Sequence, residues 1–362
     1  MTACFHGIDT PIETIKLFYG SCRHAASPYC LACFQSGMNC GWGELALPDV
    51  AHMDILAGQL SLLKGLSFQQ AFELLNSRLD VFSNTVRECA GIALLDLAGM
   101  IMGKSALDLL ELPGNLPVSG AIRIRPGNPD EATSLARNVL LTGIKSYLLI
   151  ELPGKPETDI DIIRSARQAT GQETFIVGHC RLGYGRELKP LSAALGKILR
   201  LLKVAGLDAC AAPARLNRAD WDMLQKEFPD LYLIPDAFPE EQDQDGFTPC
   251  PNRIYAIQAG TCGSIFTVAE LAKKVTQARG FITVNHSSRT DAGEKAWRQL
   301  AIGMTASWCE ITMKPWNAPR FCATWDNKPH NGKLAAEQRE PGFGLRIDPA
   351  TAKLLAENIR TC

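Results

Sequence analysis

Eight short runs of aliphatic and β-branched residues recur from about residue 118 onward, and this repetition constrains the fold more than any other feature. The runs start 23 to 33 residues apart. They are Val118–Ile124, Lys145–Glu151, Thr174–Gly178, Leu207–Ala211, Leu231–Pro235, Ile254–Gln258, Phe281–Asn285 and Cys309–Met313. Most of the intervening segments have helical periodicity, clearest in the stripe Val268, Leu271, Ala272 and Val275. Eight strands that alternate with helices predict a parallel sheet closed into a β/α barrel.

A separate α+β unit is expected before the barrel. The segments from Tyr29 to Phe34 and from Gly41 to Ala46 flank a Gln-Ser-Gly-Met-Asn turn and predict a β-hairpin. The segments Phe68–Leu79 and Val86–Met102 predict helices. With 362 residues the chain is long for one core. We therefore expect a capping domain at 1–115, a barrel at 116–325, and a C-terminal segment at 326–362 that packs back on the capping domain.

Composition excludes several classes of partner. The formal net charge is −1, which provides no field to attract nucleic acid or an anionic membrane surface. The start, Met-Thr-Ala-Cys-Phe-His, has neither the basic nor the apolar region of a signal peptide, so a cytoplasmic location is expected. The thirteen cysteines are scattered and odd in number, which argues against a disulfide framework or a structural zinc site.

Several segments, taken in order, resemble the enolase superfamily, in particular its mandelate racemase and muconate-lactonizing branch. Gly41-Trp42-Gly43-Glu44 is similar to the hairpin end of that family's capping domain. The segment 90–110 resembles the helix that leads into its barrel, and 341–348 resembles its closing strand. Residues 286–291 and Lys314-Pro315 are also similar to enolase itself and to methylaspartate ammonia-lyase. The resemblance implies a capping domain on a TIM-like barrel.

The resemblance also implies where a metal and catalytic lysines would lie. In that family a divalent cation is held by one carboxylate on each of the third, fourth and fifth strands, and the matching positions here are Gly178, Ala211 and Ala237. The lysine pair of the second strand matches Leu148 and Ile150. We therefore expect no metal ligands and no cofactor, since Mg²⁺ is not supported by these residues. A rearranged metal site at Asp236 and Glu151 is a weaker alternative.

The residues at the carboxyl ends of the strands are the candidate site, because catalytic groups of β/α barrels lie there. The catalytic candidates are His286, Lys314, His179 and Cys180, of which His286 matches a histidine found in enolases. The substrate-binding candidates are Arg123, Arg125, Arg181, Gln258, Glu151 and Asp236 at the barrel, and Tyr19, Arg23 and His24 in a loop that in this family covers the barrel mouth. The arginines suit an oxyanion, although ion pairs with nearby carboxylates are an alternative role for them.

The run His179-Cys180-Arg181 suggests two further hypotheses. A nearby histidine and arginine would favour a thiolate at Cys180, and His179, Cys180 and His286 together could hold a soft metal. An idle, buried thiol is the plain alternative for Cys180.

Two functions remain open on the sequence. The first is a diverged lyase or isomerase that moves a proton on a small carboxylate-bearing metabolite, without the usual Mg²⁺ site. His286 would move the proton, and Arg123, Arg125 or Lys314 would bind the anion. The second is a catalytically silent barrel that binds a metabolite or supports a partner protein. Self-association into a homo-oligomer is expected by analogy.

Overall fold

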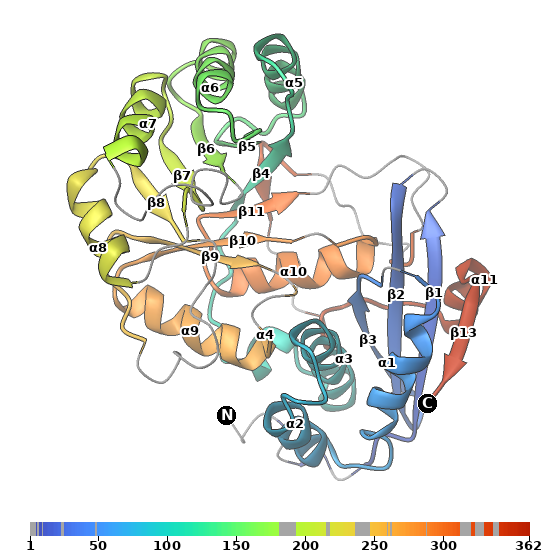
Figure 1. Ribbon diagram of the computed structural model, residues 1–362. Helices are drawn as coiled ribbons and strands as arrows, with labels where there is room; N and C mark the ends of the chain where they lie inside the picture. The colour runs from blue at the N-terminus through green and yellow to red at the C-terminus, as the bar shows by residue number, and fades with distance from the viewer. Residues whose placement is uncertain are drawn as a thin grey trace.

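The chain folds into a β/α barrel with an α+β capping domain against one side of it (Figure 1). The structure is a computed structural model. It describes residues 5, 7–8, 10–22, 25–47, 49–180, 193–214, 218–235, 247–258, 260, 263–286, 288–311, 320–322, 329–335 and 340–362.

Eight parallel strands form the nearly closed barrel that the eight runs predict. Neighbouring strands follow the order β8-β7-β6-β5-β4-β11-β10-β9, and β8 and β9 lie next to each other at the remaining seam. The strands are β4 (Val118–Ile124), β5 (Tyr147–Glu151), β6 (Phe175–His179), β7 (Ala209–Ala211), β8 (Tyr232–Ile234), β9 (Ile254–Gln258), β10 (Phe281–Asn285) and β11 (Trp308–Ile311). The short strand β12 (Lys333–Leu334) adds an antiparallel partner to β4.

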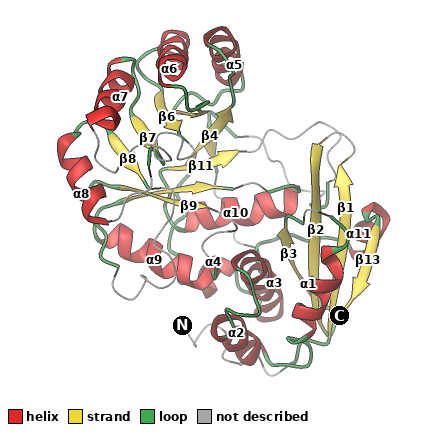
Figure 2. Ribbon diagram, in the orientation of Figure 1, coloured by secondary structure: helices red, strands yellow, loops and turns green. Residues whose placement is uncertain are grey.

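Helices cover the outside of the barrel between successive strands (Figure 2). They are α5 (Pro129–Leu141), α6 (Pro156–Thr170), α7 (Ala193–Val204), α8 (Arg218–Glu227), α9 (Ile265–Gln277) and α10 (Asp291–Gly303). Local signals set their starts: the Asn128 side chain accepts the Glu131 N–H ahead of α5, and Thr290 caps α10. Residues 247–253, between β8 and β9, form no helix or strand.

The capping domain is a four-stranded antiparallel sheet with helices. Its strand order is β13-β1-β2-β3, with β1 (Thr14–Cys22), β2 (Ala25–Ser36), β3 (Asn39–Leu45) and β13 (Asn358–Thr361). The β2–β3 hairpin and the helices α2 (Phe68–Ser77) and α3 (Asn84–Met102) are those predicted from the sequence. Strand β1 and the helix α1 (His52–Ser61) were not predicted from the sequence. The remaining helices are α4 (Ala106–Leu109) and α11 (Pro349–Leu355). No helix in the described part of the chain is long and apolar enough to cross a lipid bilayer.

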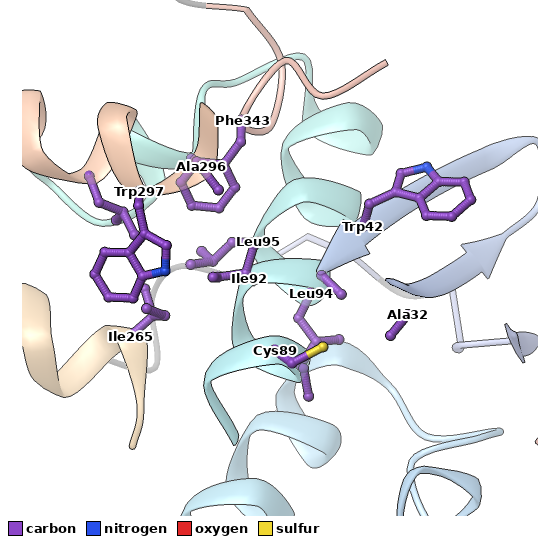
Figure 3. Close-up of a cluster of buried hydrophobic side chains, with 14 of the residues drawn as sticks. Ala32, Trp42, Cys89, Ile92, Leu94, Leu95, Ile265, Ala296, Trp297 and Phe343 are labelled. Carbon is purple, nitrogen blue, oxygen red and sulfur yellow. The ribbon is translucent and has the colours of Figure 1, made fainter. Parts of the chain in front are cut away.

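Helix α3 joins the capping sheet to the barrel. Figure 3 shows its buried side chains between Trp42 of the sheet and Trp297 of α10. On the sheet side, Gly41 and Gly43 allow the hairpin to touch the helix backbone. A Cβ at Gly41 would overlap the Ala93 carbonyl oxygen. The two glycines of the Gly-Trp-Gly-Glu motif are thus explained by close packing.

Two carboxylates of the capping domain bind backbone N–H groups of segments that are far away in the sequence. Glu44 accepts the backbone N–H groups of Arg289 and Thr290, at 2.5 and 2.9 Å, and so holds the turn after β10. Asp96 of α3 accepts the N–H of Trp42 and the N–H of Phe343. Removal of either carboxylate would leave these backbone N–H groups without their acceptor.

Candidate active site at the barrel mouth

The barrel interior is lined by alternate residues of each strand. An aromatic layer of Tyr147, Phe175, Tyr232 and Trp308 fills its amino-terminal end, with Tyr147 and Trp308 ring centroids 4.8 Å apart. Counting in steps of two from these residues gives the side chains that face inward at the carboxyl ends. Those side chains are Arg123, Glu151, His179, Ala211, Ile234, Gln258, Asn285 and Glu310.

This register corrects the positions inferred from the family resemblance. Leu148 and Ile150 belong to the apolar cluster between the barrel and its helices. A Cβ at Gly178 would contact Leu207 and Leu152, outside the barrel. The inward positions are instead Leu149 and Glu151 on the second strand and His179 on the third. On these two strands the expectation was one residue out of step, because the short strands are apolar on both faces, which hides the alternation.

Glu151 and His179 are neighbours in this ring. They are register partners on the adjacent parallel strands β5 and β6, and both stand on the inward face. The Glu151 side chain is 10% exposed and accepts a 2.7 Å hydrogen bond from Nε of Arg125. The Arg125 side chain is 70% exposed, so it reaches Glu151 from solvent. A carboxylate and an imidazole therefore stand side by side at the mouth.

Arg123 and Glu310 form the second charged pair of the ring. Arg123 donates from Nε and Nη2 to the two carboxylate oxygens of Glu310, at 2.8 and 2.9 Å. Burial opposes the charge on Arg123, but the hydrogen bonds and charge of Glu310 outweigh it, and the pKa of Arg123 is raised. The guanidinium is thus already engaged by a protein carboxylate in bidentate geometry.

A small cavity lies inside the mouth, between the aromatic layer and the charged ring. Its volume is about 10 Å³. The lining includes Arg123, His179 and Asn285, with apolar residues of the remaining strands. This inner space is too small for a metabolite, so a substrate would bind above it, toward solvent.

His286 lies next to this ring rather than in it. It follows Asn285, is 4% exposed, and its Nδ1 is 3.4 Å from the backbone N of Ser288. Asn285, one residue earlier, lines the cavity and His286 does not. A catalytic role for His286 stays a prediction, and Asn285 is the side chain that β10 directs inward.

Cys180 packs on the outside of the barrel wall. Its sulfur is 3.4 Å from that of Cys210, and both residues are buried in the apolar cluster beneath the outer helices. His179 faces the opposite way, into the barrel. Neighbours in sequence are therefore separated by the strand, because alternate residues of a strand point to opposite faces.

Tyr19 lies in a strand, not in the covering loop expected for it. It is register partner of Cys30 on β2 and of Asn358 on β13, and it is buried. Burial and the nearby charge of Glu357 raise its pKa. Arg23, His24, Arg181, Asp236 and Lys314 lie outside the described residues.

The described residues do not fit the divalent cation that the fold family implies. On the third and fourth strands, the inward end positions hold His179 and Ala211, an imidazole and a methyl group. A hard cation such as Mg²⁺ takes oxygen ligands. Within the described ranges, no three His, Cys, Asp or Glu side chains come together as a metal site.

Sequence reasoning missed four inward polar residues: Thr283, Asn285, Trp308 and Glu310. The signal that could have found them is the aromatic residue near the start of several strands, which fixes the inward parity. Phe281 predicts Thr283 and Asn285 in this way.

The fold and site define a class: a β/α barrel with an α+β cap and a polar ring at the carboxyl ends of its strands. No family model matches the chain, and no curated protein is similar to it in sequence. Solved structures are similar over nearly the whole length. The chain has the fold of the enolase superfamily, as the sequence resemblance implied.

Three such structures give the extent of the likeness. A predicted mandelate racemase from Rhodobacter sphaeroides has a TM-score of 0.79 at 17% identity, covering 95% of each chain. The 3,6-anhydro-D-galactonate cycloisomerase from Zobellia galactanivorans has 0.77 at 14%, covering 96% of this chain and 100% of that one. A member of the enolase superfamily from Salmonella Typhimurium has 0.76 at 12%, covering 98% and 100%. At these identities the likeness concerns the fold.

Proposed function

We propose that this protein is a lyase or isomerase that moves a proton on a small carboxylate-bearing metabolite, with His179 as its acid–base group. The observation that carries the proposal is the pairing of Glu151 with His179 on adjacent strands, both inward at the barrel mouth. Support from the fold comes from its solved neighbours, which include a cycloisomerase and a predicted mandelate racemase.

The chemistry of the pair suits proton transfer. Imidazole is the side chain whose ordinary pKa lies nearest neutrality, so it can both accept and release a proton there. A carboxylate on the neighbouring strand favours the protonated imidazole by charge. Glu151 would thus stabilise His179 after it has taken a proton from the carbon next to the substrate carboxylate. His286 is the second candidate for this role.

Arg125 is the candidate anchor for the substrate carboxylate. Its guanidinium is mostly exposed and makes one hydrogen bond to Glu151, so it can turn toward an anion at the mouth. Arg123 is less suited, because its two hydrogen bonds to Glu310 would have to break. Gln258 stands at the end of β9, on the same face as Ala256, and adds an amide at the rim.

We infer that the reaction proceeds without the usual metal. The proton would leave and return through His179, and the negative charge that develops on the substrate would be stabilised by hydrogen bonds and by Arg125. No step depends on a divalent cation, in keeping with the imidazole and methyl group at the third and fourth strands.

Hydrogen exchange in deuterated water tests this function without knowledge of the substrate. Purified protein treated with chelator would be incubated with a panel of small hydroxy- and amino-substituted carboxylates, and loss of the proton signal next to the carboxylate followed by NMR. We expect exchange with at least one compound, its loss of more than a hundredfold in His179→Ala, and a smaller loss in Glu151→Gln.

Two comparison variants sharpen that result. His52→Asn changes an exposed histidine of the capping domain and should leave exchange as in the parent protein. His286→Ala separates the two candidate histidines. If exchange is abolished by His286→Ala and unaffected by His179→Ala, the assignment of His179 is wrong. Exchange that depends on added Mg²⁺ would contradict the metal-free route.

A silent barrel is the second candidate, and one observation favours it. Both described arginines of the mouth are occupied by protein carboxylates, Arg123 by Glu310 and Arg125 by Glu151. Such a barrel would bind a metabolite without turnover. Calorimetric binding of a panel compound with no exchange in any variant would support this function over catalysis.

A further inference from the structure

Three inward side chains on neighbouring strands form the polar wall of the barrel cavity. Thr283 and Trp308 are register partners on β10 and β11, and Asn285 is the next inward residue of β10. All three line the same cavity as His179. Thr283 is 0% exposed and Trp308 is 2% exposed, so bulk water does not reach them.

Each of these side chains has a buried polar atom that lacks a hydrogen-bond partner among the described residues. The atoms are Thr283 Oγ1, Asn285 Oδ1 and Trp308 Nε1. Buried polar atoms are rarely left without a partner, because their hydration has been lost without compensation. Three of them around one cavity indicate that something polar fills it.

The size and chemistry of the cavity identify that ligand. A water molecule needs a cavity of about 10–15 Å³, and the volume here is about 10 Å³. The indole N–H is a donor, the amide oxygen an acceptor, and the hydroxyl is both. Buried water typically makes about three hydrogen bonds, which is the number of atoms available.

We propose that a resident water molecule occupies this cavity, held by Thr283, Asn285 and Trp308 and in contact with His179. The inference goes beyond the proposed reaction, because it concerns the free protein and needs no substrate. The water completes the hydrogen bonding of the barrel interior. It also places an oxygen that can accept or donate a proton against the inner side of His179.

The direction in which one substitution shifts the midpoint of thermal unfolding tests the proposal. Thr283→Val keeps the shape of the side chain and removes its hydroxyl. If a water satisfies that hydroxyl, the variant loses a hydrogen bond and should unfold about 1–2 °C below the parent protein. If the hydroxyl has no partner, its removal relieves a buried polar group and should raise the midpoint.

Two control variants show how the unfolding midpoint changes when a hydrogen-bonded hydroxyl is removed and when an unpartnered one is removed. Thr174 donates its hydroxyl to the Lys145 carbonyl at 2.8 Å, so Thr174→Val reports the loss of a known buried hydrogen bond. Ser36 is 2% exposed, and its hydroxyl also lacks a partner among the described residues. It does not line this cavity, so Ser36→Ala should leave the midpoint unchanged or raise it. We expect Thr283→Val to behave like Thr174→Val.

A second measurement covers the case in which Thr283→Val does not fold. A crystal structure of the unsubstituted, ligand-free protein should show one solvent peak within hydrogen-bond distance of Trp308 Nε1. An empty cavity there, or a Thr283→Val midpoint above that of the parent protein, overturns the proposal. Neither result bears on proton exchange by His179, so the two conclusions can fail separately.

Discussion

Arg123 and Glu310 join the first and last strands of the barrel through two parallel hydrogen bonds of 2.8 and 2.9 Å. Both side chains are mostly buried. Loss of one partner would leave the other charge without compensation, which typically costs about 3–5 kcal/mol. We therefore expect Arg123→Met to lower the free energy of unfolding by about 3 kcal/mol, and the double variant Arg123→Met/Glu310→Leu to recover most of that loss. Urea unfolding measures both.

The exposed pair Arg78–Asp80 is the control, where Arg78→Ala should change stability by less than about 1 kcal/mol. Equal losses in the single and double variants would contradict the expectation.

Stability should fall as the pH rises from 5 to 8, because of a buried carboxyl in α3. Burial raises the pKa of Glu88 from 4.5 to about 8, against the opposing hydrogen bonds from Gly260 and Trp297, and the charge of Glu44 adds to the rise. A raised pKa means that the folded protein binds this proton more tightly than the unfolded chain does. The stabilisation is complete below pH 4.5 and is lost as the pH rises through about 8.

Glu88→Gln isolates this effect. The parent protein should lose up to about 1.4 kcal/mol per pH unit through Glu88 within that window, and the variant should lose less over the same range. Urea unfolding at pH 5 and pH 8 measures the difference. The same pH dependence in both proteins would show that Glu88 is not the group responsible. Burial also raises the pKa of Asp96 to about 7, so a residual slope is expected in the variant.

Gly41 should not tolerate a methyl group, whereas Gly58 should benefit from one. A Cβ at Gly41 would overlap backbone atoms of α3, at Ala93 and Leu97. Gly58 lies within α1 and has open space around its Cα. Gly41→Ala is expected to destabilise by about 3 kcal/mol through overpacking, and Gly58→Ala to stabilise by about 0.5–1 kcal/mol through reduced chain entropy and better helix propensity. Thermal and urea unfolding of the matched pair provide the check. A stable Gly41→Ala protein would mean that the hairpin does not touch α3.

Among the cysteines that the structure describes, thiol reagents should label Cys40 much faster than Cys180 in the native protein. The hydrogen bond from the Cys33 thiol lowers the pKa of Cys40 to about 7, and Cys40 is partly exposed. Cys180 and Cys210 are buried. Labelling with a maleimide followed by peptide mass analysis should show Cys40 modified at a rate that rises through pH 7. Loss of the fast phase in Cys40→Ser is the control. Rapid modification of Cys180 would restore the idea that it is a reactive thiol.

The eight barrel strands are predictable because each is a short apolar run bounded by polar helices, a pattern that needs no tertiary information. The inward face of each strand is less predictable. Leu148, Leu149 and Ile150 are all apolar, because one face packs in the barrel and the other under helices. The one-residue error that placed the family's positions at Leu148 and Gly178 follows from this. Glu151 and His179 were recognised as strand-end groups, but their pairing depends on the register between β5 and β6, which local sequence does not encode.

The missed strand β1 illustrates a second limit. Its residues Thr14–Cys22 pair with β2, the next strand in the sequence, on one side and with β13, at the far end of the chain, on the other. Tyr19 lies in the middle of that strand, although the resemblance to known capping domains suggested a loop. The pairing with β13, at the other end of the chain, leaves little trace in the periodicity of a nine-residue segment.

The pairing of β1 with β13 also has a kinetic consequence. Residues 14–22 and 358–361 lie on either side of the whole barrel sequence, so the barrel is in effect an insertion between two strands of one sheet. Contacts of such long sequence separation carry a large loop-closure cost until the intervening chain has become compact. The edge strand should therefore dock last during folding and detach first when the native protein opens locally. In hydrogen-exchange terms, the amides of β13 would report the cap alone, while those of β4 to β7 would report the barrel.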